Sequence, residues 1–176
     1  VSIVKEKENG TMEVLLVSPF NAFMVLVSKA VPYLLLSLVN LTVILLLSIY
    51  VLHLPVNGSL LLLYVISTLF IVVALSLGLL ISNLTASQQV AMMISLMGMM
   101  VPSILLTGFM FPLENMPYAL QLFSHISPAK WYYIIIKAIM IKGLGFTAIW
   151  KETLILVVMV VVLTVVNIRK FRIRLE

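Results

Sequence analysis

The chain has 176 residues, a formal net charge of +5 and no cysteine. Hydrophobic residues make up 63% of it and charged residues only 10%, whereas a soluble domain carries roughly a quarter charged residues. The mean hydropathy of +1.24 excludes a water-soluble fold, and the lack of cysteine excludes disulfides, thiol nucleophiles and zinc–thiolate sites.

The N-terminal segment combines charge with a short amphipathic pattern. Charged residues are dense at its start, and Gly10 and Thr11 then supply a chain break and a candidate N-cap. Met12, Leu15 and Leu16 share one helical face, which predicts a two-turn amphipathic helix. A helix this short is not stable alone, so it is expected to dock on lipid headgroups or on a protein partner.

Four apolar segments follow, each close to the ~20 residues that a membrane-spanning helix needs. Residues 30–113 contain no Asp, Glu, Lys or Arg at all. Because the bilayer offers no water to backbone groups, each span must be a helix. The sequence therefore predicts an all-α, polytopic helical membrane protein with spans at about 31–52, 60–81, 90–111 and 153–168.

An outer helical hairpin is predicted over about residues 112–146. Ser127 is a candidate N-cap, and Pro128 suits the first helical position. The apolar and aromatic helix expected at 129–141 would be about 20 Å long, too short for the ~30 Å hydrocarbon core. We expect it to lie at the outer interface or to enter the membrane and return.

The basic tail sets the expected orientation. Four spans place both ends of the chain on one side, and all three arginines lie in residues 169–176. Lys and Arg collect on the cytoplasmic side of membrane proteins. Seven of the 11 basic residues then lie inside and four outside, which predicts a multi-pass protein of the cytoplasmic membrane. The expected organisation is a cytoplasmic segment at 1–28, a transmembrane bundle at 29–168 and a cytoplasmic tail at 169–176.

Two side-chain patterns within the spans leave alternatives open. A small-residue stripe on the second span allows close helix approach, either within the chain or at a subunit interface: Ala74, Gly78 and Ser82. A methionine stripe on the third span suits flexible packing or lipid contact, or else an adaptable lining for apolar substrates: Met93, Met97 and Met100.

The sequence offers no chemistry of its own. It has no phosphate-binding G-x-x-x-x-G-K-[ST] loop, so any ATP would be bound by another subunit. His53 and His125 are isolated and lack the spacing of metal ligands. No nucleophile with a nearby base is suggested. We expect a chain that is not an enzyme and binds no cofactor or metal.

One stretch carries a family resemblance. The segment Glu6-Lys7-Glu8-Asn9-Gly10-Thr11-Met12-Glu13, continued by Leu15-Leu16-Val17-Ser18-Pro19, is similar to the E-K-E-x-G-T-x-E-x-L-x-x-S/T-P segment of type 2 ATP-binding cassette (ABC) permeases. In that family it is the coupling helix region that the nucleotide-binding subunit contacts. The resemblance therefore implies an ATPase-contact set: Glu6, Lys7, Glu8, Gly10, Thr11, Glu13, Leu15 and Leu16.

Further stretches extend the resemblance over essentially the whole chain: Gly108–Pro112, Met116–Pro117, Ser127–Pro128 and Trp131–Tyr133 match the family's outer hairpin. Family members usually have six spans, with a large outer domain between the first two. The chain opens on Val1 in charged sequence and supplies four spans, so we expect it to be the C-terminal half of such a permease. The position before Pro128, often Asn in the family, is Ser127 here.

The resemblance implies the permease subunit of an ATP-driven exporter. ATP and Mg²⁺ would be bound by a separate cytoplasmic ATPase, and a second permease copy or homologue would complete the path through the membrane lipid. The expected substrate is amphipathic, drug-like or lipid-like, since the spans offer no buried charge for an ion relay. The alternative is a non-transporting scaffold or assembly protein that recruits a cytoplasmic partner; an intramembrane enzyme is disfavoured by the lack of a polar constellation.

Overall fold

The computed structural model describes Val4 and residues 22–172, and every regular element in that part of the chain is helical. The predicted coupling helix and its contact residues fall in 5–21, outside the described residues. The elements follow in chain order: α3 (Ala22–Leu46), the π-helical η1 (Leu47–Val51), α4 (Leu60–Leu84), α5 (Gln88–Ser95), the π-helical η2 (Leu96–Met100), α6 (Val101–Leu105), the 3₁₀ turn η3 (Leu113–Asn115), α7 (Tyr118–Ser124), α8 (Pro128–Met140) and α9 (Phe146–Arg172).

Four helical stretches are long and apolar enough to cross a membrane, which confirms the all-α, four-span prediction: Val27–Val51, Leu60–Leu84, Gln88–Leu105 and Phe146–Lys170. The third span ends earlier than hydropathy indicates, because Gly108 adopts a left-handed backbone with φ 82° that terminates the helix. The last helix is longer than the apolar run at 153–168. Its first two turns contain Lys151 and Glu152, which lower the local hydropathy but are compatible with a helix.

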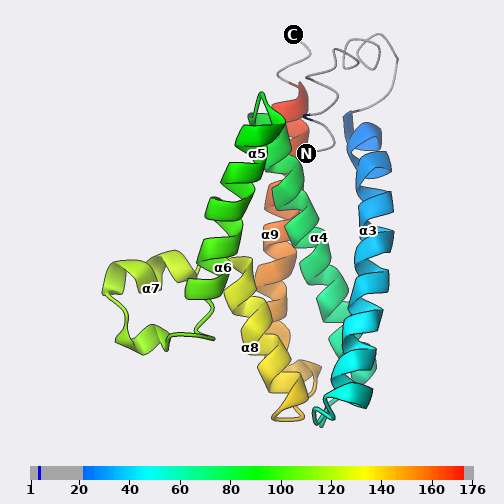
Figure 1. Cartoon of the computed structure of the whole chain (residues 1–176), viewed down its shortest axis with the longest axis vertical. Helices are drawn as coiled ribbons and strands as arrows, with labels where there is room; N and C mark the ends of the chain where they lie inside the picture. Colours follow the sequence, from blue (N-terminus) through cyan, green and yellow to red (C-terminus); the bar gives the residue numbers. More distant parts are fainter. Residues whose placement is uncertain (1–3, 5–21, 173–176) are drawn as a thin grey trace.

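The spans run up and down between two ends of the bundle (Figure 1). The terminal end holds Ala22, Leu84, Gln88 and Arg172, and the hairpin end holds Val51, Leu60, Met140 and Phe146. Helix α8 starts near mid-height and runs to the hairpin end, while α7 projects sideways from the bundle. The short helix α8 therefore occupies only one half of the bundle's depth, as expected of a re-entrant element.

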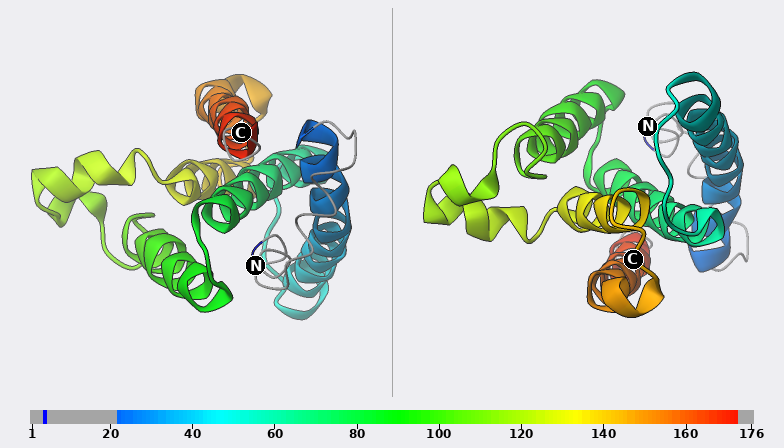
Figure 2. Two further views of the ribbon diagram at one scale, coloured as in Figure 1. Left: turned by 90° about the horizontal axis from the view of Figure 1, so that it is seen from above. Right: turned by 90° about the horizontal axis from the view of Figure 1, so that it is seen from below.

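The core is a three-helix unit of α4, α8 and α9. Its buried apolar residues come from these helices and from no other described element: Leu63, Ile66, Val73, Ile135, Ala138, Ile139, Ile149 and Leu156. In α3 none of the most apolar window is buried, and in the third span 6% is, against 22% in α4. Figure 2 shows α4 at the centre, with α3 on one side and the third span on the other. The two outer spans are thus attached to the core more loosely than the core helices are to one another.

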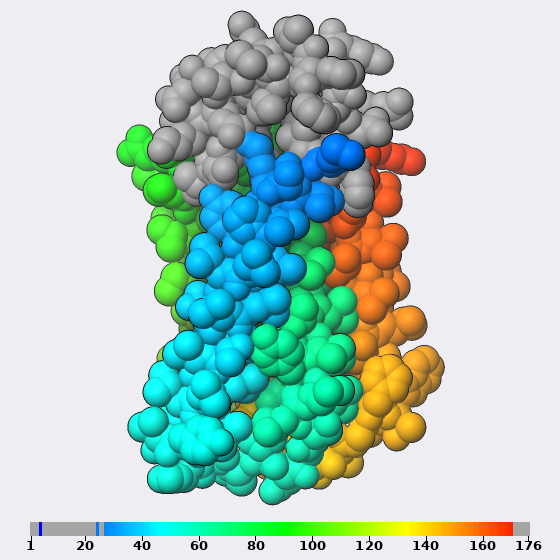
Figure 3. Space-filling view, turned by 90° about the vertical axis from the view of Figure 1, so that its right-hand side faces the viewer, coloured from blue at the N-terminus to red at the C-terminus, as the bar shows by residue number. Residues whose placement is uncertain are grey.

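Helix α3 lies along α4 at the surface of the bundle (Figure 3). Most of its apolar side chains are exposed. In water such a surface would mark an interaction site, but for a span it is the surface expected to meet lipid or another span. Thr42 Oγ1, near the end of α3, and Tyr64 Oη, near the start of α4, form a hydrogen bond of 3.3 Å.

A buried amide pair joins α4 to α9 towards the terminal end. Asn167 Nδ2 donates a hydrogen bond to the Ser76 carbonyl at 2.9 Å, and Asn83 Nδ2 donates to Asn167 Oδ1 at 3.1 Å. Asn167 is 2% exposed, so the nitrogen and the oxygen of its side-chain amide both form hydrogen bonds away from solvent. Hydrogen bonds between membrane helices of this kind stabilise packing by about 1–2 kcal/mol at most.

Replacing Asn167 by leucine should therefore lower the free energy of unfolding by about 1–2 kcal/mol, because α9 loses two polar contacts to α4. The measurement is thermal unfolding of the purified protein in detergent. Val165→Leu is the control, since Val165 is 44% exposed on the same helix and should tolerate the change. Equal stability of Asn167→Leu and the unaltered protein would contradict a stabilising amide pair.

Candidate functional site

The third span is a deformed helix. Its middle, η2, uses π-type hydrogen bonds, with the Val101 N–H bonded to the Leu96 carbonyl. Pro102 follows directly, and a proline ring inside a helix clashes with the carbonyl four residues earlier, here Gly98. The wider π turn relieves that clash, and π segments are frequent at functional sites. The span can therefore bend at η2 more easily than a regular helix.

The methionine stripe lies on the outward face of this span. Met93, Met97 and Met100 are 56%, 73% and 55% exposed. None of the three lines the pocket that lies on the other side of this span. The structure thus brings the three side chains to one face, where a second subunit or lipid would meet them.

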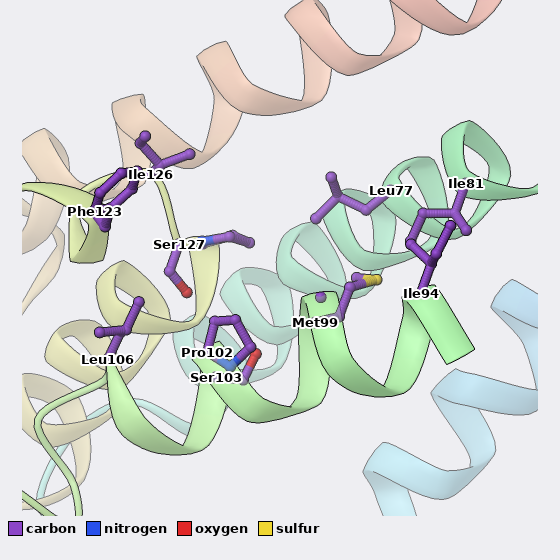
Figure 4. A pocket seen from close by; sticks show the side chains of 12 residues that line it. Leu77, Ile81, Ile94, Met99, Pro102, Ser103, Leu106, Phe123, Ile126 and Ser127 are labelled. Atoms are coloured by element: carbon purple, nitrogen blue, oxygen red, sulfur yellow. The ribbon is translucent and has the colours of Figure 1, made fainter. Parts of the chain in front are cut away.

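The opposite face of the same span encloses a pocket of about 460 Å³ (Figure 4). Its walls come from α4, from the third span and from the junction of α7 with α8: Leu77, Ile81, Ile94, Gly98, Met99, Pro102, Ser103, Leu106, Phe123, Ile126, Ser127 and Pro128. We call it the seam pocket. Sequence reasoning did not find it, because its walls come from segments that no local pattern links.

The turn between α7 and α8 is held by a buried lysine. Lys130 Nζ donates hydrogen bonds to Ser124 Oγ at 3.0 Å and to His125 Nε2 at 3.1 Å. The His125 Nε2 atom must then be unprotonated, so Nδ1 carries the hydrogen donated to the Gln121 carbonyl at 2.8 Å. Burial lowers the pKa of the Lys130 ammonium from its ordinary value. These contacts fix the hairpin's shape beside the seam pocket.

Helix α8 is anchored to α4 at its middle. Tyr132 Oη donates a hydrogen bond to Ser67 Oγ at 2.7 Å, and its ring stacks on Phe70 with centroids 4.2 Å apart and planes 3° from parallel. The Ser67 hydroxyl in turn donates a hydrogen bond to the Leu63 carbonyl. Tyr132 lies in the apolar and aromatic helix that the sequence predicts at 129–141. The spacing of Ser67 and Phe70 on one face of the second span was the available signal for the docking site that holds it.

The loop between the first two spans caps α8 at the hairpin end. The Asn57 backbone N–H donates to the Met140 carbonyl at 3.1 Å, and its Nδ2 donates to the Ile141 carbonyl at 3.0 Å. A Cβ on Gly58 would lie 2.6 Å from the Ile139 carbonyl oxygen, so the loop approaches α8 too closely for any other residue without a shift. Asparagine and glycine are typical turn residues, and Asn57 and Gly58 lie in the loop between α3 and α4. The structure gives them a further role as the cap of another helix.

The small-residue stripe is divided between two environments. Ser82 is 2% exposed, and its Oγ accepts a hydrogen bond from the Val4 N–H at 3.3 Å. A Cβ on Gly78 would meet no atom within 4 Å among the described residues. Ala74 is half-buried one turn away. Gly78 is therefore not needed for close packing within the described chain, and its surroundings leave room for another helix.

The residues that flank the proposed coupling segment lie together. Val4 packs beside Ser82 near the end of α4, and Ala22 starts α3 at the same terminal end. Arg169 and Lys170 lie there too, in the last turns of α9. Among the described residues, no group of three His, Cys, Asp or Glu side chains is arranged to hold a metal ion.

Comparison with known proteins identifies related membrane proteins. The chain matches the family described as "ABC-2 family transporter protein" over residues 1–169. It is 36% identical over 152 residues to the probable multidrug ABC transporter permease YbhR of Escherichia coli strain K12, covering 86% of this chain and 41% of the relative. It is 35% identical over 141 residues to the probable multidrug ABC transporter permease YbhS of the same strain, covering 80% of this chain and 37% of the relative.

A more distant relative is ABC transporter G family member 20 of Dictyostelium discoideum, 31% identical over 157 residues, which cover 88% of this chain and 21% of that protein. The chain spans less than half the length of these three relatives. No solved structure matches it.

Proposed function

The chain belongs to the ABC-2 family of transporter proteins, and we propose that it forms part of the membrane path of an ATP-driven exporter. It is a multi-pass, helical permease component. The observation that carries the proposal is the family match across residues 1–169, which includes the charged N-terminal segment together with all four spans. The chain itself would catalyse no reaction.

A separate cytoplasmic subunit would bind and hydrolyse ATP with Mg²⁺ and would grip the coupling segment. The contact set from the sequence is Glu6, Lys7, Glu8, Gly10, Thr11, Glu13, Leu15 and Leu16. Val4 and Ala22, which flank the segment, both lie at the terminal end, and this placement supports a single docking face. The positive-inside bias of the tail supports a cytoplasmic location for that end and for both ends of this chain.

The structure supports a division between a rigid core and movable outer spans. The core of α4, α8 and α9 shares buried apolar side chains and the contacts of Asn167 and Tyr132. The third span has few buried residues and contains the π segment η2, where it would bend most easily. Closure of the ATPase would shift the terminal ends of α3 and of the core helices. The third span would then move with them by bending at its π segment η2.

A second permease copy, or a homologue, would face the third span. Its outward methionine stripe would then line the path: Met93, Met97 and Met100. The flexible, polarisable thioether side chain adapts to apolar groups of varied shape. The open space beside Gly78 would accept a helix of the same assembly, next to Ala74 and Ser82. The substrate would be amphipathic, drug-like or lipid-like, and two relatives are named as probable multidrug permeases.

A cysteine cross-linking experiment tests the proposal. These 176 residues contain no cysteine, so Thr11→Cys adds a single thiol to them. The experiment uses the full-length permease, with any cysteine elsewhere in it replaced by serine, co-expressed with its ATPase subunit. We expect a cross-linker with a maleimide at one end and a photoreactive diazirine at the other to react with the thiol at position 11 and, after illumination, to join it to the ATPase. The matched control is Leu54→Cys, an exposed loop position at the hairpin end that should give no such product.

Two results would overturn the proposal: a cross-link from position 54 and none from position 11, or no association with any ATPase. A partner that cross-links to position 11 but hydrolyses no ATP would favour the non-transporting scaffold.

A further inference from the structure

The seam pocket has the size and lining of a ligand site. Its volume of about 460 Å³ falls in the ~300–1,000 Å³ range of small-molecule pockets. Ten of its 12 lining residues are apolar, glycine or proline, and none is ionisable. A charged group would lose hydration there without a partner. The occupant must therefore be largely apolar and uncharged in the part that enters.

Two hydroxyl groups break the apolar lining. Ser127 is the N-cap of α8, yet its side chain makes no capping hydrogen bond. N-cap serines ordinarily accept a hydrogen bond from the helix start, and the N-caps Ser59 and Ser87 of this chain do so. The Ser127 hydroxyl instead lies on the pocket wall, close to Pro102 (Figure 4).

Ser103 likewise lacks the hydrogen bond that is usual for its position in a helix. A serine or threonine inside a helix often donates to the carbonyl four residues earlier. Several hydroxyls in the described part of the chain make that bond, among them Thr42, Ser67, Thr68, Ser76, Thr85 and Thr153. Ser103 makes no side-chain hydrogen bond to any described residue, and the residue four positions earlier, Met99, belongs to the π segment η2. Its hydroxyl also lines the pocket.

We infer that the seam pocket binds a neutral amphiphile, with its apolar body between α4 and the third span and its single hydrogen-bonding group held by Ser103 and Ser127. A long-chain alcohol or the ester end of an acyl chain has this chemistry. The molecule could come from the bilayer or from a transported cargo. The site lies on the opposite face of the third span from Met93, Met97 and Met100, so it is distinct from the methionine-lined surface proposed above.

The experiment uses hexadecanol that carries a diazirine on its chain, added to the full-length permease and its ATPase in phospholipid nanodiscs. After illumination in the absence of ATP, we expect labelled peptides from the pocket walls at 94–106 and 123–128. Gly98→Phe should lower the labelling at least fivefold by filling the pocket. The first added carbon is tolerated, since a Cβ there meets only Ile94 Cγ2, at 3.8 Å. Leu96→Phe is the matched control, because Leu96 is 58% exposed and does not line the pocket.

A second variant tests the hydroxyls without adding bulk. With Ser103→Ala and Ser127→Ala combined, half-maximal labelling should need about three to ten times more probe, as expected for a lost hydrogen bond. Diazirine-bearing hexadecane, which lacks the hydroxyl, should label the variant and the parent equally. Labelling that falls during ATP turnover identifies the occupant as cargo, and labelling that stays constant identifies it as a bilayer lipid; either outcome supports the site.

Labelling confined to residues outside the pocket walls, which also include α4 at Leu77 and Ile81, would overturn the inference. Equal loss in Gly98→Phe and Leu96→Phe would overturn it as well, as would an unchanged requirement for hexadecanol in the double alanine variant. Because labelling is measured without ATP, a failure here is distinct from a failure of the proposed export function.

Discussion

Reversing the charge of Glu13 to lysine should reduce ATP-driven export by the assembled transporter at least tenfold. Under the proposed function, Glu13 sits in the first turn of the coupling helix, where a carboxylate is favoured by the helix dipole and faces the ATPase. Disrupting one charged group of a buried interfacial pair costs about 2–5 kcal/mol, roughly 30-fold or more in affinity. Copurification of the ATPase and efflux from energised vesicles are the two measurements.

Glu114→Lys is the matched control for that experiment. It makes the same charge reversal at an exposed position in η3, on the lateral hairpin and away from the terminal end. We expect normal ATPase copurification and near-normal efflux. If Glu13→Lys keeps its ATPase and its export, or if both reversals fail alike, the coupling role of the N-terminal segment is wrong.

The spans were predictable because the information for each is local. The charge-free run over 30–113 and the ~20-residue length requirement define helices without knowledge of their neighbours. Ser127 and Pro128 mark the start of α8 for the same reason, and the structure begins that helix at Pro128. Gly108 is a local signal as well, since glycine readily adopts the positive φ that ends the third span.

The packing was not predictable, because it depends on pairs far apart in sequence. Tyr132 and Ser67 are 65 residues apart, and Asn167 and Ser76 are 91 apart. Most residues along these spans are apolar or weakly polar, so hydropathy does not say which face of a span meets which helix. The seam pocket could not be predicted for a related reason. The π-helical hydrogen bonds of η2 change which side chains face inward, and a regular 3.6-residue period does not predict that change.

These contacts give the bundle an uneven stiffness that suits the proposed mechanism. Every buried apolar core residue outside the N-terminal segment and α5 lies on α4, α8 or α9. The core is also tied near both ends, by Asn167 towards the terminal end and by Asn57 at the hairpin end. A push delivered at the terminal end would therefore be transmitted by the core as one body, and the looser outer spans would change their contacts with it.

The contact between the loop at Asn57–Gly58 and the end of α8 should be the place where one added methyl group lowers the stability most. We expect Gly58→Ala to destabilise the protein by about 2–4 kcal/mol, from overpacking and the loss of hydrogen bonds. The new Cβ would lie 2.6 Å from the Ile139 carbonyl oxygen, and that atom belongs to helix backbone and does not rotate away. The loop must shift, and both hydrogen bonds from Asn57 to the end of α8 would then be strained or lost.

Thermal unfolding in detergent measures this effect, with a fall in Tm of roughly 5–15 °C for a chain of this size. Gly78→Ala is the control, because its Cβ meets no atom within 4 Å and alanine favours the helix by up to ~1 kcal/mol. Hydrogen exchange should rise in residues 138–144 of Gly58→Ala and stay unchanged in Gly78→Ala. Equal stability of the two variants would show that the loop shifts at no cost in free energy. The position of α8 beside the third span would then not depend on its hydrogen bonds to Asn57.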